Sequence, residues 1–304
     1  MALLALAAWE TGGAWGSLWL LVPLATAVSL LVAWRFGAWA LPIPVLALGL
    51  AVTLFPGNVL WMGWLPAAAL AGVWMGLREE GGGLTLGERA WTLLPVLAVA
   101  AMLPWAPGYA ATLARVSAHM READAQMTEF YRQLGMSGDR LRGWESALRE
   151  SAGLRETVLP YALPTVLFVW VALLVQSGRT LASRVGTLLR WPRLTIGHLI
   201  EWRLPDGALW VFLLGLALIV SKLTPWAPTA WTLAVNGALG YCLQGIGVVQ
   251  SLLLVRGFPP YMVTILLVFA LVMAWPVFLL LAACVGLSDI WLDYRRLERV
   301  PHEE

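Results

Sequence analysis

The stretch that decides the fold is residues 17–77, which read SLWLLVPLATAVSLLVAWRFGAWALPIPVLALGLAVTLFPGNVLWMGWLPAAALAGVWMGL. It holds three apolar runs, Ser17–Trp34, Gly37–Phe55 and Gly57–Leu77, and its only charged side chain is Arg35. Each run is about as long as the roughly 20 residues that a helix needs to cross about 30 Å of hydrocarbon. A water-soluble fold would need a polar face on these segments, and they have none. The chain is therefore predicted to be an integral membrane protein.

The composition of the whole chain agrees with that prediction. Of its 304 residues, 60% are hydrophobic and 12% are charged, which is about half the charge of an ordinary soluble domain. A net charge of +2 indicates neither nucleic-acid binding nor a polybasic tether to lipid. The two cysteines, Cys242 and Cys284, fall inside predicted spans and are expected to be buried small hydrophobes, not a disulfide. No cleavable signal peptide is expected at the N-terminus.

The predicted fold class is an all-α polytopic membrane protein with about eight transmembrane helices. Lipid offers no hydrogen-bond partner to open strand edges, and the alternation typical of an outer-membrane barrel is absent. The predicted spans are Ser17–Trp34, Gly37–Phe55, Gly57–Leu77, Ala90–Leu113, Thr157–Gln176, Gly207–Val220, Thr229–Val255 and Tyr261–Leu287. An extension of the short sixth span to Trp226 is left open.

A polar region, Arg115–Glu156, separates the fourth and fifth spans and carries seven arginines and seven acids. Apolar residues recur there at steps of three and four, at Leu113, Val116, Met120, Ala123, Met127, Phe130 and Leu134. This heptad-like stripe predicts a helix that ends at Gly135, and Ser137 or Asp139 can cap a second helix. We predict an amphipathic charged helical hairpin on or beside the membrane, its first arm continuing the fourth span. The stripe either packs on its own protein or docks a partner.

A second polar region, Gly178–Pro205, holds five arginines against Glu201. It predicts that the fifth helix continues past the membrane as a basic amphipathic arm. Eight spans place both termini on one side, and eleven Lys and Arg against nine then favour termini and hairpin inside. A count that is wrong by one span would instead place the two polar regions on the same side.

The chain shows no internal repeat and no low-complexity linker, so it is treated as a single membrane domain over residues 1–304. Its predicted parts are four N-terminal spans (14–113), the charged hairpin (114–156), four C-terminal spans (157–288) and a polar tail (289–304).

The residues that could carry chemistry are few. No predicted span holds an ionised side chain in its middle, which argues against a proton pump or voltage sensor but leaves Na⁺ coordination by carbonyls open. No HExxH, CxxC, GxSxG or Walker-type motif occurs, so no catalytic residue, metal site or cofactor is predicted. Asp289 and Asp293, one helical turn apart, could bind a metal or activate water. We favour the structural interpretation, in which they pair with Arg295 or Arg296.

Uncharged polar residues are more informative in the seventh span. Asn236, Gly240, Gln244, Gly247 and Ser251 lie at steps of 4, 4, 3 and 4 and share one face, with Gln250 beside it and Gln176 ending the fifth span. These residues either hydrogen-bond helices together or line a site for a neutral or zwitterionic ligand.

In the third span, Ala68, Gly72 and Gly76 form a small-residue track that predicts close helix packing.

Three strings in the C-terminal two thirds together resemble the YybS-like family of bacterial inner-membrane proteins of unknown function. They are Glu201–Pro205, Asn236–Gln250 and Gly286–Arg295, and the resemblance covers roughly residues 90–297. The positions that carry it most clearly are Trp202, Pro205, Asp289, Asp293 and Arg295.

That family is distantly similar to the S subunits of energy-coupling-factor importers and to rod-shape proteins of the MreD type. The resemblance implies a six-helix core, in the bacterial inner membrane, that holds a small ligand or a partner protein. Our leading hypothesis is a small-molecule-binding or transport-associated subunit. The alternatives are a non-transporting scaffold for envelope assembly or cell shape and, more distantly, a membrane enzyme. The expected partners are the lipid bilayer and either membrane proteins or an ATPase module, but no nucleic acid; the ligand is unknown.

Overall fold

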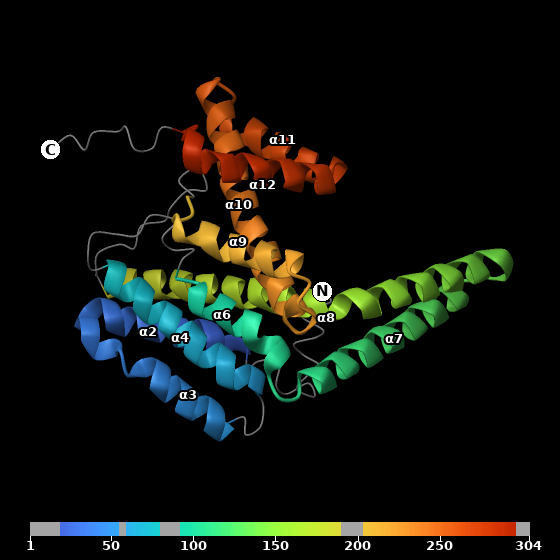
Figure 1. The fold of residues 1–304 in the computed structure, drawn as a ribbon, viewed down its shortest axis with the longest axis horizontal. Helices are drawn as coiled ribbons and strands as arrows, with labels where there is room; N and C mark the ends of the chain where they lie inside the picture. The colour runs from blue at the N-terminus through green and yellow to red at the C-terminus, as the bar shows by residue number, and fades with distance from the viewer. Residues whose placement is uncertain (1–18, 55–58, 80–91, 190–202, 296–304) are drawn as a thin grey trace.

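The computed structural model describes residues 19–54, 59–79, 92–189 and 203–295, and these residues form helices and no strand (Figure 1). The helices are α2 (Leu21–Phe36), α3 (Ile43–Leu54), α4 (Val59–Glu79), α6 (Leu94–Met102), α7 (Tyr109–Gln133), α8 (Gly138–Leu188), α9 (Gly207–Val220), α10 (Ala227–Val255), α11 (Pro260–Met273) and α12 (Trp275–Leu292). Short 3-10 turns occur at η2 (Gly37–Ala40), η3 (Leu103–Trp105) and η5 (Thr224–Trp226).

Four helical segments within the described ranges are long and apolar enough to cross a membrane. They are α2 with η2, α8, η5 with α10, and α12; α6 with η3 and α7 form a bent pair that would make a fifth. Helices α3, α9 and α11 are apolar but shorter. The all-helical membrane fold class is therefore confirmed, whereas the number of eight spans stays a prediction.

One predicted span in the C-terminal half is wrong. The span predicted over Tyr261–Leu287 is broken, since α11 ends at Met273 and Ala274 leaves the helical region (φ −133°, ψ 37°) before α12 begins. Pro276 explains the break, because its nitrogen has no hydrogen to donate to a carbonyl of α11. The sixth apolar segment has the predicted bounds, because α9 covers Gly207–Val220, and its possible extension to Trp226 does not occur.

The first arm of the hairpin does not continue the fourth span as predicted. Helix α7 leaves the segment Leu94–Trp105 at an angle of 89°. Ala106 is extended (φ −70°, ψ 138°), as a residue before a proline tends to be, and Pro107 is followed by Gly108 at φ 86°. These three residues end one helix and redirect the next, which places α7 outside the bundle.

The N-terminal bundle is built around α2, which packs against both α4 and α8. A Cβ added at Gly72 would lie 2.5 Å from the Thr26 carbonyl oxygen, and one at Gly76 would lie 2.6 Å from the Leu30 carbonyl oxygen. On the other side, a Cβ at Gly178 of α8 would lie 2.5 Å from the Pro23 carbonyl oxygen. Small residues thus let two helices touch the backbone of α2. Ala68, on the same α4 track, is fully buried.

Helix α10 joins this bundle to the C-terminal helices, because it packs against α9 and α12 and also against α6 and α8 (Figure 1). The Trp105 indole donates to Thr229 Oγ1 at 3.1 Å, and the Thr229 hydroxyl donates to the Ala101 carbonyl at 2.7 Å. The Trp105 and Trp226 rings lie 4.6 Å apart. These contacts tie the end of α6 to the start of α10.

Candidate functional site

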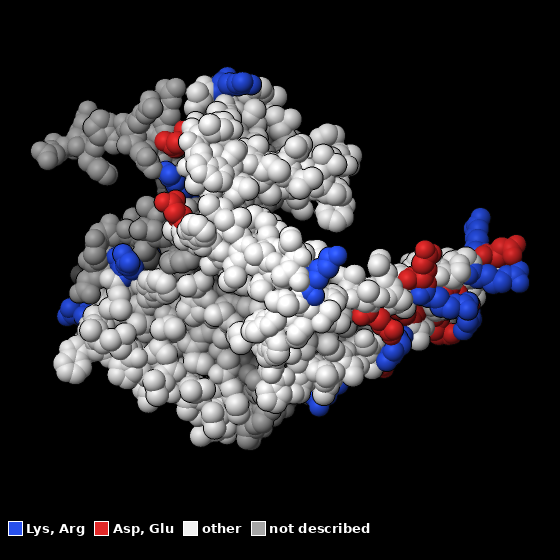
Figure 2. All heavy atoms as spheres, viewed as in Figure 1, with Lys and Arg blue, Asp and Glu red and all other residues white. Residues whose placement is uncertain are grey.

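The most distinct feature of the surface is an arm formed by α7 and the N-terminal part of α8. It projects from the bundle (Figure 1), and most of the charged side chains in view gather on it (Figure 2). Helix α8 has 51 residues and is therefore about 75 Å long, whereas crossing the hydrocarbon takes roughly 20 residues. The helix is therefore longer than one span requires, and its charged end, together with α7, is expected to lie outside the hydrocarbon.

The arm turns where the sequence predicts. Helix α7 ends before Gly135, which has φ 86° and whose N–H donates to the Arg132 carbonyl at 3.0 Å. The N–H of Met136 donates to the Tyr131 carbonyl at 3.0 Å, which completes a Schellman cap. Ser137 takes the N-cap position of α8 in an extended conformation, but its side chain makes no capping hydrogen bond.

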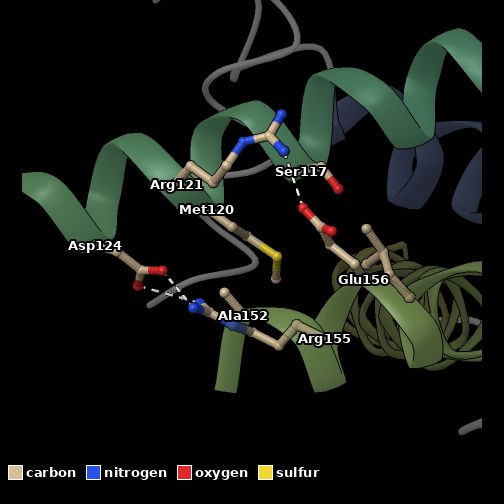
Figure 3. A pocket seen from close by; sticks show the side chains of 8 residues that line it. Ser117, Met120, Arg121, Asp124, Ala152, Arg155 and Glu156 are labelled. Carbon is tan, nitrogen blue, oxygen red and sulfur yellow. Dashed lines mark hydrogen bonds and ion pairs between the residues drawn. The ribbon is translucent and has the colours of Figure 1, made fainter. Parts of the chain in front are cut away.

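The two helices of the arm are held together by ion pairs. Arg155 donates two hydrogen bonds to the Asp124 carboxylate, and Arg121 Nη1 lies 2.9 Å from Glu156 Oε1 (Figure 3). The hydrogen bonds to Asp124 hold the pKa of the Arg155 guanidinium above its ordinary value. Toward the tip, an Arg132–Glu145 pair at 3.7 Å continues the series.

Polar side chains also line the spaces between the two helices. A small cavity of about 10 Å³ is lined by Ser117, Met120, Arg121, Asp124, Ala152, Arg155, Glu156 and Leu159 (Figure 3). Nearer the tip, an open groove of about 390 Å³ is lined by Asp124, Ala125, Thr128, Glu129, Arg132, Glu145, Leu148 and Arg149. The contact between the two helices thus combines ion pairs with apolar and aromatic side chains, among them the Tyr131 and Trp144 rings, whose centroids lie 4.9 Å apart.

In the part of α7 nearest the tip of the arm, the apolar stripe faces away from α8. Val116 at the base is buried, but Met127, Phe130 and Leu134 are 47%, 53% and 67% exposed. The stripe therefore packs on its own protein only near the bundle. This follows from the ion pairs, because residues facing α8, such as Asp124, are offset from the stripe around the helix. On α8, Leu154 is exposed as well.

The junction of arm and bundle has its own hydrogen bond. Pro164 has no N–H, so the carbonyl of Pro160, four residues earlier in α8, lacks its helical donor. The Tyr109 hydroxyl, at the start of α7, donates to that carbonyl at 2.8 Å. Tyr109 thus stabilises α8 where it enters the bundle, a role that the sequence prediction missed.

A second candidate site is a buried polar network between α10 and the end of α12. The side chains of Asp289 and Arg295 are 2% and 1% exposed, and Arg295 Nη2 lies 2.7 Å from Asp289 Oδ2. Gln244 Nε2 donates to the same oxygen at 3.1 Å, and the Tyr294 N–H donates to Oδ1 at 3.1 Å. The amide oxygen of Gln244 accepts from the Leu204 N–H at 3.0 Å. The Asp289 carboxylate and the Gln244 amide therefore together join three separate parts of the chain.

The two aspartates that the sequence placed one turn apart have different surroundings. Asp289 is buried in the network, whereas Asp293 is half-buried and caps α12 in the left-handed region (φ 40°, ψ 58°). The turn at Asp293 brings Arg295 back onto Asp289. Arg295 was one of the two partners expected for these aspartates. The other, Arg296, lies outside the described residues.

Helices α10 and α12 pack closely against each other beside this network. A Cβ added at Gly245 of α10 would lie 1.8 Å from the Ala282 carbonyl oxygen, and one at Gly286 of α12 would lie 1.9 Å from the Tyr241 carbonyl oxygen. Sequence reasoning did not select Gly245. The signal was present as two pairs of residues at spacing four, Tyr241 with Gly245 and Ala282 with Gly286.

The remaining predicted residues do not all come together. Asn236 is buried, its Nδ2 donates to the Thr232 carbonyl at 2.7 Å, and its Oδ1 has no hydrogen-bond partner among the described residues. Gly240 packs against Leu204, since an added Cβ would lie 2.9 Å from its Cδ1. Gly247 is buried, whereas Gln250, Ser251 and Gln176 are half-buried and make no side-chain hydrogen bond with Asn236 or Gln244 in the described part.

Three further expectations can be compared with the structure. Cys242 is buried as expected, but Cys284 is exposed, and both are free thiols. Of the family-motif residues, the Pro205 carbonyl accepts from the Ala208 N–H at 2.8 Å, and Trp202 lies outside the described residues. Within the described ranges, no cluster of three or more His, Cys, Asp or Glu could hold a metal ion.

Comparison with known proteins gives a family and no function. No curated protein matches the chain, and no solved structure does. The model of one family, described as a predicted membrane protein (DUF2232), matches residues 15–290. This range includes both the arm and the Gln244–Asp289 contact. Since DUF2232 is the YybS-like family, the resemblance is confirmed, and the chain belongs to this family of predicted membrane proteins.

Proposed function

We propose that this protein is a membrane-anchored, protein-binding subunit that presents the α7–α8 arm to a partner outside the lipid. One observation carries the proposal: the arm places ion pairs between its two helices and leaves apolar side chains of α7 exposed. Exposed Met127, Phe130 and Leu134 lie in a row on a surface otherwise rich in charge. This favours the scaffold hypothesis, in which the protein organises an assembly at the bacterial inner membrane.

The cost of this arrangement supports a binding role. Fully burying an apolar side chain is worth about 1.5–3 kcal/mol, so three exposed ones forgo several kcal/mol unless a partner covers them. The ion pairs between the two helices return little in comparison, because pairs near water are worth at most about 1 kcal/mol each. A hairpin selected only for its own stability would turn the stripe toward α8.

The test compares partners captured by wild-type protein and by two variants. In the first, Met127→Ser and Phe130→Ser remove the exposed stripe; in the second, Ala118→Ser alters an exposed residue on the opposite side of α7. Complexes are extracted from native membranes with mild detergent and identified by mass spectrometry. We expect the first variant to lose at least ten-fold of its co-purified protein and the control to keep it. Equal recovery from all three proteins would contradict the proposal.

The second candidate is a small-molecule-binding or transport-associated subunit resembling an S component. The buried Asn236 Oδ1 favours it, because an acceptor without a donor costs about 1–3 kcal/mol, which a ligand donor at the α8–α10 contact would recover. Native mass spectrometry should then detect a small molecule on wild-type protein and not on Asn236→Leu. Recovery of an ATPase with a coupling membrane subunit would also support it.

The absence of a bound molecule from freshly extracted wild-type protein, with only cell-wall or division proteins recovered, would contradict this second candidate. The enzyme hypothesis receives no such support. It relied on Asp289 and Asp293 acting as a pair, whereas Asp289 is bound by Arg295 and Gln244 and Asp293 caps α12.

A further inference from the structure

We propose that the partner covering the exposed stripe of α7 is a second copy of this chain, paired through Ala123, Met127, Phe130 and Leu134. This inference rests on the proposed function, since it assigns the occupant of the same surface. The paired helices would run parallel, related by a two-fold axis along the membrane normal.

The spacing of the stripe is that of a two-stranded seam. Met120, Met127 and Leu134 occupy the a positions of a heptad, and Ala123 and Phe130 occupy the d positions. A stripe restricted to a and d is the narrow form that faces one partner helix, and the core-facing stripe of a globular helix is wider. The base of the stripe is buried in this chain, and from Ala123 onward it is exposed.

The charges beside the seam permit two identical surfaces to meet. The g positions are Gln126 and Gln133, which are exposed and uncharged. The e positions are Asp124, which is already bound by Arg155 of the same chain, and the uncharged Tyr131. Arg132, at the outward f position, is paired with Glu129 and Glu145. Like charges that face each other would disfavour self-association, and none do so across this two-fold axis.

The membrane supplies the alignment and the concentration. Copies inserted in one bilayer share one orientation, so their arms project on the same side. Because α7 runs beside the long helix α8 that enters the bundle, two α7 helices that pair in this way run parallel (Figure 1). Four seam layers over about 12 residues would be marginal for free helices. Confinement of the copies to one bilayer plane raises their local concentration and limits their relative orientations. The short seam is thus suited to reversible pairing of anchored copies.

Cysteine cross-linking tests the proposal with a matched pair of exposed alanines. In a background with Cys242→Ala and Cys284→Ser, Ala123→Cys places a thiol on the seam, and Ala118→Cys places one on the opposite side of α7. Oxidation in native membranes should convert most of the Ala123→Cys protein to a species of twice the monomer mass and leave Ala118→Cys monomeric. Equal cross-linking of both variants, or none from either, would overturn self-pairing.

A charge swap gives a second test that does not need the cysteine-free background. Two differently tagged copies are expressed together, and capture of one tag is scored for the other. We expect co-capture of wild-type copies, at least a ten-fold loss when both carry Phe130→Glu, and recovery when one carries Phe130→Glu and the other Phe130→Lys. Failure to recover overturns self-pairing.

The two proposals fail in distinguishable ways. If Ala123→Cys cross-links to a protein of another mass, the arm still binds a partner, but the partner is not a second copy. If the serine variants retain all co-purified protein, including other copies of the chain, the proposed function itself is wrong.

Discussion

Asp289 is the residue on which the C-terminal half most depends, because side chains or backbone from α10, the end of α12 and the loop before α9 meet around it. The sequence predicted its pairing with a nearby arginine. It did not predict burial, because Gln244 is 45 positions away and nothing local indicates that α10 and α12 cross there. Local charge patterns identify partners a few residues apart, but contacts between distant helices depend on the folded structure.

At this residue scale, Asp289→Ala should destabilise the protein by about 3–5 kcal/mol, because it removes a buried carboxylate that binds both the Arg295 guanidinium and the Gln244 amide. The measurement is thermal unfolding in detergent. Asp293→Asn is the matched control; asparagine tolerates the left-handed conformation, so the midpoint should change little. An Asp289→Ala midpoint equal to that of wild type would show that the pair contributes nothing to stability.

A double variant separates charge from packing at the same site. Asp289→Ala combined with Arg295→Met should recover most of the loss, since a buried pair replaced by apolar groups is often near neutral. A double variant no more stable than the single one would assign the loss to hydrogen bonds with Gln244 and Tyr294.

At the scale of elements, Gly286→Ala should prevent the close crossing of α10 and α12, because the added Cβ would lie 1.9 Å from a backbone oxygen that cannot yield alone. We expect the yield of folded protein, read as the monodisperse peak in size exclusion, to fall several-fold. Gly153→Ala in α8 is the control. Its Cβ would meet nothing within 4 Å, so it should be neutral or stabilise the helix by about 0.5–1 kcal/mol. Equal yields would contradict the crossing.

Helix ends were easier to predict than helix directions. Gly135 ended α7 as expected, because a glycine in the left-handed region satisfies the last carbonyls locally. The break at Ala274 and the turn at Gly108 were not predicted, although prolines marked both places. A proline removes a hydrogen bond, but the resulting angle depends on what the next helix packs against. The sequence predicted the apolar stripe on α7. It did not predict that the stripe would face away from α8, because that depends on ion pairs between residues more than 30 positions apart, such as Asp124 and Arg155.

At the scale of the whole molecule, hydropathy alone predicted a membrane protein, because each span satisfies its own backbone and is recognisable without its neighbours. With eight spans, a small excess of basic residues, eleven against nine, predicts that the arm lies in the cytoplasm. The test is labelling of Ala118→Cys, with Cys242 and Cys284 replaced, by a maleimide that cannot cross membranes. Inverted vesicles should label at least five-fold more than intact spheroplasts, and the reverse ratio would contradict the prediction.

Helix α8 also has a mechanical consequence. About 33 Å of it lies in the arm before Pro160 and about 42 Å continues through the bundle, at 1.5 Å per residue. The Tyr109 hydroxyl fixes a fulcrum between these two lengths. Because α8 is continuous from Gly138 to Leu188, a sideways load on the tip would be transmitted along it toward the contact of Gly178 with the backbone of α2. A partner that binds the tip of the arm would therefore also exert force on the helices of the bundle.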